Sequence, residues 1–177
     1  MKYKLLLVAF FATVMGWGQI LTFEFSALAG SEPTANSSTN ASGIDNSIIS
    51  RGSGLTPSSN SGRFNSVDWA VSSIDNAISG NDYVQFTVSP NSGYQFNISS
   101  IVVQWQRSAT GNTQVVLRNS IDNYTSNIDG VKSIVDNTST QTLTWTFSQN
   151  NTSSPITYRL YSFAEASAGS GGPGDGT

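Results

Sequence analysis

The sequence of 177 residues contains no cysteine and no histidine. Without cysteine the chain forms no disulfide bond, so the fold has to rest on a hydrophobic core and on hydrogen bonds. Without histidine the chain has no Ser-His-Asp triad, no Cys-His pair and no zinc site with histidine ligands. These two absences exclude the commonest nucleophilic and zinc-dependent mechanisms.

Charged side chains are also scarce. They make up 11% of the sequence, with eight basic residues against eleven acidic ones and a net charge of −3. The basic residues form no cluster, and binding to nucleic acid depends on Lys and Arg side chains that neutralise phosphates. We therefore expect no nucleic-acid partner. Ser, Thr, Asn and Gln solvate the surface instead, as they do in many extracellular β-domains.

The N-terminus has the pattern of a secretory signal. Lys2 and Lys4 precede the apolar run LLLVAFFATVM, which is too short to span a bilayer. The small residues of GWG at 16–18 predict cleavage after Gly18; a membrane anchor or a buried helix is the alternative. We expect a secreted or outer cell-surface protein with no membrane span. Cleavage would leave six basic against eleven acidic residues, a net charge of about −5.

The remaining sequence alternates between apolar and polar residues, which is the period of a β-strand. The clearest segments are ILTFEFS, DYVQFTVSP and QTLTWTFSQ. Turn residues separate about eight to ten such strands, and only residues 67–79 drift towards a helical period. The pattern predicts an all-β fold over residues 19–167, an antiparallel β-sandwich of the jelly-roll kind with at most one short helix.

The C-terminal stretch after this domain is rich in glycine and reads as structureless. Residues 168–177 have the sequence AGSGGPGDGT. They are interpreted either as a linker to another domain or as a loop cut before one last strand, which in a jelly roll would pair with the first strand. Both readings predict further domains in a longer parent chain.

Several segments resemble a domain that recurs in secreted and surface proteins of Bacteroidota, the cargo of type IX secretion. The segments are ILTFEFS, SRGSGL, ITYRLYSFAEASAGSG and the block from FTVSPNSGY to LRNSIDNY. The resemblance covers residues 20–171. It implies a jelly-roll sandwich similar to galactose-binding-like and carbohydrate-binding modules, located beside catalytic or adhesive domains. It implies no enzymatic activity and no assigned functional residues.

The segment IVVQWQRSATGNTQVVLRNS at 101–120 is predicted to be a hairpin. Alternation places Trp105 with aliphatic residues, and Trp145 lies between Leu143 and Phe147, so both tryptophans are expected in the core on facing sheets. Arg107 and Arg118 flank the Gly-Asn turn. With Asp122 they are expected to form a structural ion pair that fixes the loop, with Tyr124 as its hydrophobic anchor; ligand binding by the arginines is the alternative.

Glycans are bound by aromatic rings that stack on sugar C–H groups and by polar side chains that bond to hydroxyls. Ligand contacts are therefore expected from aromatic residues turned outward. One arginine, which shares a strand face with one of these aromatic residues, is expected to join them. These candidates are Trp69, Tyr83, Tyr94, Arg159 and Tyr161.

A structural Ca²⁺ ion is the candidate cofactor, because oxygen ligands suit an exported domain without histidine. Glu24, Glu32 and Glu165 are the predicted ligands, since the first and last strands are expected to pair near them. No segment has the spacing of an EF-hand loop.

The expected function is a non-catalytic module that binds glycan or contributes to adhesion. An enzyme acting on polysaccharide is an alternative, either a hydrolase with two carboxylates or a lyase using Tyr and Arg. The acidic residues are scattered, which weighs against the hydrolase. A purely structural spacer domain is the third alternative.

Overall fold

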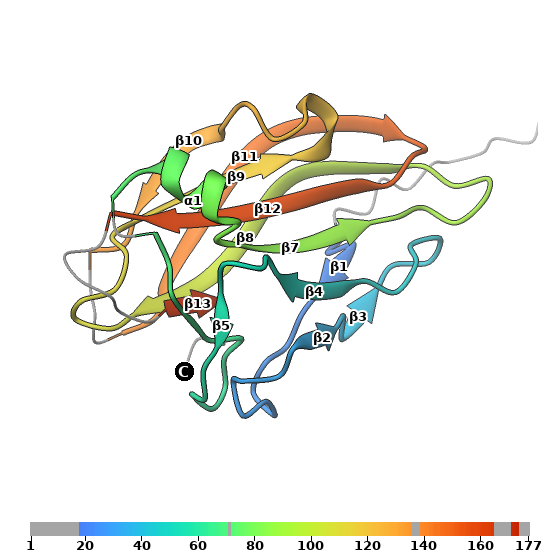
Figure 1. The fold of residues 1–177 in the computed structure, drawn as a ribbon. Helices are drawn as coiled ribbons and strands as arrows, with labels where there is room; N and C mark the ends of the chain where they lie inside the picture. Colours follow the sequence, from blue (N-terminus) through green and yellow to red (C-terminus); the bar gives the residue numbers. More distant parts are fainter. Residues whose placement is uncertain (1–17, 71, 136–138, 165–170, 174–177) are drawn as a thin grey trace, which may run out of the picture.

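The structure is a computed structural model that describes residues 18–70, 72–135, 139–164 and 171–173. It is an all-β domain of antiparallel sheets that pack face to face, with one short helix and one 3₁₀ turn, and the predicted fold class is confirmed (Figure 1). No helix among the described residues is both long enough and apolar enough to cross a membrane. The predicted signal at residues 1–18 lies almost wholly outside the described residues.

Two large sheets form the sandwich. The six-stranded sheet has the order β10-β9-β12-β7-β4-β2. Its strands are β2 (Thr34–Asn36), β4 (Ile48–Arg51), β7 (Tyr83–Val88), β9 (Gln114–Asn119), β10 (Ile128–Ser133) and β12 (Ile156–Phe163). The five-stranded sheet has the order β11-β8-β13-β6-β5. Its strands are β5 (Thr56–Pro57), β6 (Ser66–Val67), β8 (Phe96–Arg107), β11 (Gln141–Thr152) and β13 (Gly171–Pro173). A separate pair joins β1 (Leu21–Thr22) to β3 (Thr39–Asn40).

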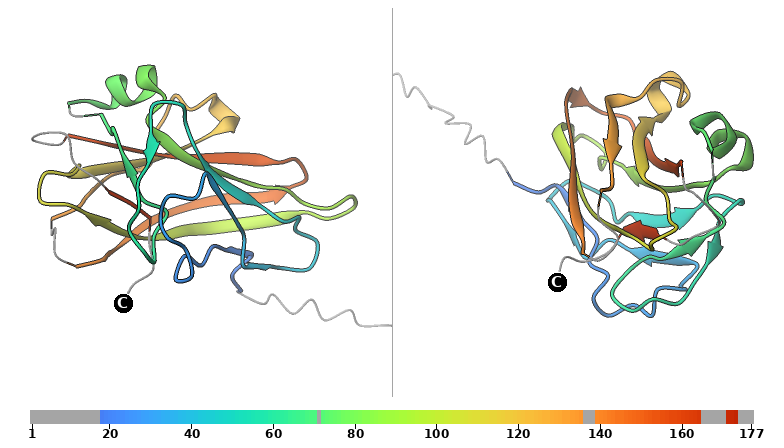
Figure 2. Two further views of the ribbon diagram at one scale, coloured as in Figure 1. Left: turned by 60° about the horizontal axis from the view of Figure 1, so that its bottom comes forward. Right: turned by 90° about the vertical axis from the view of Figure 1, so that its left-hand side faces the viewer.

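The strand order from β6 onward is that of a jelly roll. Strands β6, β13, β8 and β11 are neighbours in one sheet, and β7, β12, β9 and β10 are neighbours in the other. The chain therefore passes repeatedly between the two layers (Figure 2). This winding explains why residues far apart in the sequence meet on one face.

The core lies between the layers and is rich in aromatic side chains. Trp105 and Trp145 are 1% and 0% exposed, so their predicted burial is confirmed. They do not lie on facing sheets, however, because β8 and β11 pair directly, with Trp105 opposite Gln141 and Trp145 opposite Ile101. Alternation predicts which face a side chain occupies but contains no information on which strands are partners.

The predicted hairpin at 101–120 is wrong. Strand β8 belongs to the five-stranded sheet and β9 to the six-stranded sheet, so the turn between them crosses from one layer to the other. The Arg107 guanidinium fixes this crossing, because it donates hydrogen bonds to the carbonyl oxygens of Ser108, Ala109 and Ile134. Arg118, the partner predicted across the turn, belongs to β9 and therefore to the other sheet.

The helix α1 (Ile74–Gly80) lies in the segment where a short helix was expected, and it covers one end of the outer face of the six-stranded sheet (Figure 1). Ser73 is its N-cap and accepts a hydrogen bond from the Asn76 N–H. Asn81 ends the helix in the left-handed conformation. Ala77 is buried against a small apolar cluster that also contains Ala70, Val116, Tyr161 and Phe163.

The glycine-rich C-terminal stretch contributes a strand that the sequence did not predict. Gly171–Pro173 forms β13, which lies between β6 and β8 and pairs with both. A strand can form without side chains because its pairing uses the main chain alone. The structureless reading is therefore corrected for these three residues, and the expected pairing of first and last strands is also wrong, because β1 pairs with β3.

Candidate functional site

The outer face of the six-stranded sheet carries the candidate site. On β12 the side chains of Tyr158 and Leu160 point into the core, so Arg159 and Tyr161 project to the outer face, as alternation predicted. Strand pairing places Gln85 of β7 opposite Arg159 on one side and Arg118 of β9 opposite it on the other. We use the name Arg159 cluster for these residues together with two tyrosines. Its members are Tyr83, Gln85, Arg118, Tyr124, Arg159 and Tyr161.

The guanidinium of Arg159 lies between two tyrosine rings. Its Cζ is 4.1 Å from the centre of the Tyr83 ring and 3.8 Å from the centre of the Tyr124 ring. A planar guanidinium has two faces, and two rings at this distance can only occupy one face each without clashing. Both stacked contacts are favourable cation–π interactions. The N–H groups, which lie in the plane between the rings, are what the cluster leaves open for a ligand.

Hydrogen bonds to two neutral side chains orient the Arg159 guanidinium. Its Nε donates to Gln85 Oε1 at 3.0 Å, and its Nη1 is 3.4 Å from the Tyr161 hydroxyl. Three further N–H groups of the guanidinium have no partner among the described residues. Arg159 as a whole is partly buried.

Tyr161 has a different position from the one predicted. It shares the outer face with Arg159, but it is 1% exposed because helix α1 and its apolar cluster cover it. Its ring meets the edge of the Tyr83 ring, with centroids 5.4 Å apart. The prediction that Tyr161 faces solvent is therefore wrong. Its observed role is to support Tyr83 and to accept from Arg159.

Trp69 is also buried, at 4% exposed, and the prediction that its ring faces outward is wrong. The preceding residue, Asp68, has a positive φ of 67°, and this turn leaves Asp68 exposed and Trp69 inside. The Trp69 ring packs against Trp105 with centroids 5.7 Å apart. Alternation cannot assign a face in an irregular segment, which is why the sequence misled here.

Tyr94 is exposed, as predicted, but lies apart from the Arg159 cluster. It is 51% exposed and rests on Gly43, whose φ of +87° and missing side chain leave room for the ring. The structure therefore brings Tyr83, Arg159 and Tyr161 together and separates them from Tyr94 and Trp69. Whether any of the five contacts a ligand stays a prediction.

The loop after β9 accepts hydrogen bonds from Arg118, the second arginine of the cluster. Asn119 caps the 3₁₀ turn η1 (Ser120–Asp122), and the chain then returns through Tyr124. Arg118 donates from Nε to Asn127 Oδ1 at 2.7 Å and from Nη1 to the Tyr124 carbonyl oxygen at 2.8 Å. These bonds hold Tyr124 over Arg159, so the loop is part of the site.

Asp122 does not pair with either arginine. Its two carboxylate oxygens accept hydrogen bonds from the N–H groups of Thr125 and Ser126, which lower its pKa although partial desolvation opposes the shift. The expected structural unit of Arg107, Arg118 and Asp122 is therefore corrected. Each of the three residues fixes its own loop through main-chain or amide partners.

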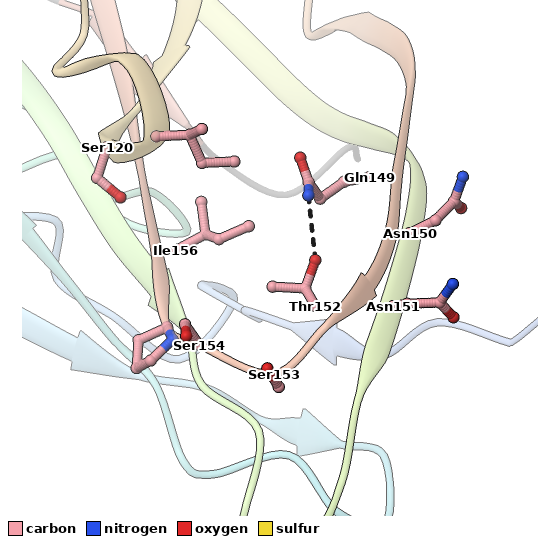
Figure 3. Close-up of a pocket in the computed structure, with 10 residues that line it drawn as sticks. Ser120, Gln149, Asn150, Asn151, Thr152, Ser153, Ser154 and Ile156 are labelled. Atoms are coloured by element: carbon pink, nitrogen blue, oxygen red, sulfur yellow. Dashed lines mark hydrogen bonds between the residues drawn. The ribbon is translucent and has the colours of Figure 1, made fainter.

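A shallow groove of about 330 Å³ lies beside η1, whose residues Ser120 and Ile121 line it. Its walls are the end of β11, the β11–β12 turn, the start of β12 and η1, and amide and hydroxyl side chains dominate its lining. In Figure 3, Gln149 and Thr152 turn towards the space, whereas Asn150 and Asn151 point away from it. Gln149 Nε2 donates to Thr152 Oγ1 at 3.1 Å.

The groove and the Arg159 cluster share the η1 loop. Ser120 lines the groove, and its hydroxyl accepts from the N–H of Thr157, two residues before Arg159 on β12. Two strand residues span about 7 Å, so the groove begins within the length of a few sugar rings from Arg159. The sequence missed this adjacency because only the pairing of β12 with β9 creates it.

The predicted calcium ligands have separate surroundings. Both carboxylate oxygens of Glu32 accept main-chain hydrogen bonds, from Ala29 N at 2.7 Å and Gly30 N at 2.8 Å, and the first of these is the main cause of its lowered pKa. Glu24 is exposed, and Glu165 lies outside the described residues. The part of the chain that the structure describes contains no group of three or more acidic side chains that could hold a metal ion. Calcium binding stays a prediction.

Comparison with known proteins found no family model that matches the chain, no similar curated protein and no similar solved structure. The site therefore has to be interpreted from its own chemistry.

Proposed function

We propose that this protein is a non-catalytic glycan-binding domain and that the Arg159 cluster with the adjoining groove is its contact surface. The observation that carries the proposal is the Arg159 guanidinium on the outer face of the sheet, held between two tyrosine rings and with N–H groups that have no partner among the described residues. Aromatic rings and a fixed hydrogen-bond fork are the groups with which proteins hold sugar rings and their hydroxyls.

The surroundings support the same proposal. The groove offers Gln149 and Thr152 as neutral donors and acceptors beside the cluster. The resemblance to carbohydrate-binding jelly rolls of secreted and surface proteins of Bacteroidota belongs to this proposal, as do the exported location, adhesion as a biological role and a longer parent chain.

The scattered acidic residues weigh against the hydrolase alternative. The pKa of Asp82 is raised, first by burial and then by the charge of Asp68. A raised pKa suits a general acid, but Asp82 is 8% exposed and its carboxylate lies against the backbone of Gly54 and Gly80. A substrate would have no access to it.

A glycan array with the purified chain tests the proposal. We expect binding to a defined set of polysaccharides that is lost in Tyr124→Ala and Arg159→Ala, with both variants shown to be folded by circular dichroism. The Tyr94→Ala variant tests the exposed tyrosine outside the Arg159 cluster, because loss of binding there would move the site to the Gly43 region. A blank array with the folded wild-type chain would contradict the proposal and favour a spacer domain.

A further inference from the structure

Two arginines face each other on the outer surface of the six-stranded sheet. In the register of β12 and β9, Arg159 lies directly opposite Arg118. Side chains in such positions have Cβ atoms about 4.5–5.5 Å apart, and like charges placed there destabilise the sheet. A protein with a net charge of −3 thus concentrates two of its few cations at one point.

No carboxylate of the described residues compensates this pair. The ion pair within the described residues joins Lys132 to Asp129, at 3.0 Å, and it involves neither arginine. Asp122 is the acidic residue nearest to Arg118 in the sequence, and its oxygens are engaged by the N–H groups of Thr125 and Ser126. The partners of Arg118 and Arg159 are amide, carbonyl and hydroxyl oxygens, all of them neutral.

Both guanidinium groups are held in fixed positions with donors to spare. The Tyr83 and Tyr124 rings cover the faces of Arg159, and Asn127 with the Tyr124 carbonyl holds Arg118. Each guanidinium has five N–H donors, of which three lack a partner in the described part of the chain. A fixed planar fork of N–H groups matches the oxygens of a carboxylate or a sulfate.

We infer that the Arg118–Arg159 pair binds an acidic group of an anionic polysaccharide, either the carboxylate of a uronic acid or a sulfate ester. The inference rests on the proposed glycan-binding function and names the class of glycan. The rest of the surface argues against nucleic acid, because a polyphosphate needs a track of cations along the whole chain and this protein is acidic. A sugar polymer with isolated charges needs only one such point, beside neutral groups such as those of the groove.

The test compares chemically matched polysaccharides by isothermal titration calorimetry. The carboxylate arm uses polygalacturonate against its fully methyl-esterified form, and the sulfate arm uses carrageenan against neutral agarose. We expect binding to the acidic member of one arm, weakened about tenfold or more in Arg118→Gln and in Arg159→Gln. Arg63→Gln is the matched control, because Arg63 bonds to Asn60 and Gln106 away from the cluster. Its affinity should equal that of the wild-type chain.

The outcomes separate this inference from the proposed function. Equal binding to the acidic and neutral members, unchanged by 0.5 M salt, would overturn the inference and leave the glycan-binding proposal standing. Equal weakening by all three Arg→Gln changes, or comparable binding to single-stranded DNA, would show a general response to charge and would also overturn it. Absence of binding to every polysaccharide on a full array would overturn both. Should either variant fail to fold, competition by inorganic sulfate against the wild-type complex provides the same test.

Discussion

Gly172 lies against the main chain of Phe64 so closely that a methyl group on its Cα would be 2.6 Å from the Phe64 carbonyl oxygen. This contact fixes β13 next to β6, in the middle of the five-stranded sheet. Backbone atoms cannot move aside as a flexible side chain can. Residues Gly171–Pro173 are therefore a packed part of the sandwich.

Replacement of Gly172 by alanine should weaken the packing of β13 against β6. We expect Gly172→Ala to lower the free energy of unfolding by about 1–3 kcal/mol, the usual cost of overpacking. Urea denaturation followed by tryptophan fluorescence measures it. An unchanged midpoint would mean that β13 contributes little to the stability of the sheet.

Arg51 is a half-buried connector of the N-terminal strands. It lies 3.6 Å above the Phe64 ring and donates to Ser66 Oγ and to the carbonyl oxygens of Gly30, Glu32 and Asn65. Burial lowers its pKa to about 10, so it remains charged at neutral pH.

Lysine cannot replace the Arg51 guanidinium, because its ammonium group neither stacks flat on the Phe64 ring nor reaches four separate acceptors. We expect Arg51→Lys to cost about 2–4 kcal/mol of stability, since buried carbonyl groups lose their donors. Arg63→Lys is the control at a less enclosed arginine, whose side chain bonds to Asn60, Ser61 and Gln106, and should cost less than about 1 kcal/mol. Equal effects of the two changes in denaturant would contradict the assignment.

Asp82 should make the stability of the protein depend on pH. Its pKa is raised above 3.8 in the folded protein, by burial and by Asp68. A carboxyl group with a raised folded pKa contributes stability that is complete below its ordinary pKa and is lost as the pH rises through the folded value.

Asp82→Asn removes this titration. The variant should be more stable than the wild-type chain at pH 7, and the difference should vanish near pH 3. Thermal unfolding at both pH values measures it, with Asp45→Asn as the exposed control. A gain of the same size at pH 3 would show that ionisation is not the cause.

A substitution of Trp69 distinguishes a core role of this residue from a role in ligand binding. Because its ring packs on Trp105 inside the sandwich, Trp69→Ala should cost about 3–5 kcal/mol in chemical denaturation. Val135→Ala, at an 82% exposed side chain, should change stability by less than about 0.5 kcal/mol. A stable Trp69→Ala variant that loses glycan binding would restore the original prediction for this residue.

Part of the candidate site could be predicted from the sequence. Tyr83 and Arg159 were predicted as ligand contacts because alternation turns both to the outer face of their strands. Gln85 and Arg118 could not be found in this way, since they join the site through strand pairing across 74 and 41 residues of chain. Arg118 was instead assigned to a loop ion pair with its sequence neighbour Asp122, which is the error expected when only local partners are visible.

Composition and a period of two are local properties, so the excluded chemistry, the all-β class and the burial of Trp105 and Trp145 could be predicted from the residues alone. Which strands are neighbours, the crossing of residues 101–120 between layers and the burial of Trp69 became known only from the folded chain. Pairing depends on how the whole chain packs, and no local pattern encodes it. The opposed pair of Arg118 and Arg159, on which the proposed ligand class depends, exists only through that pairing.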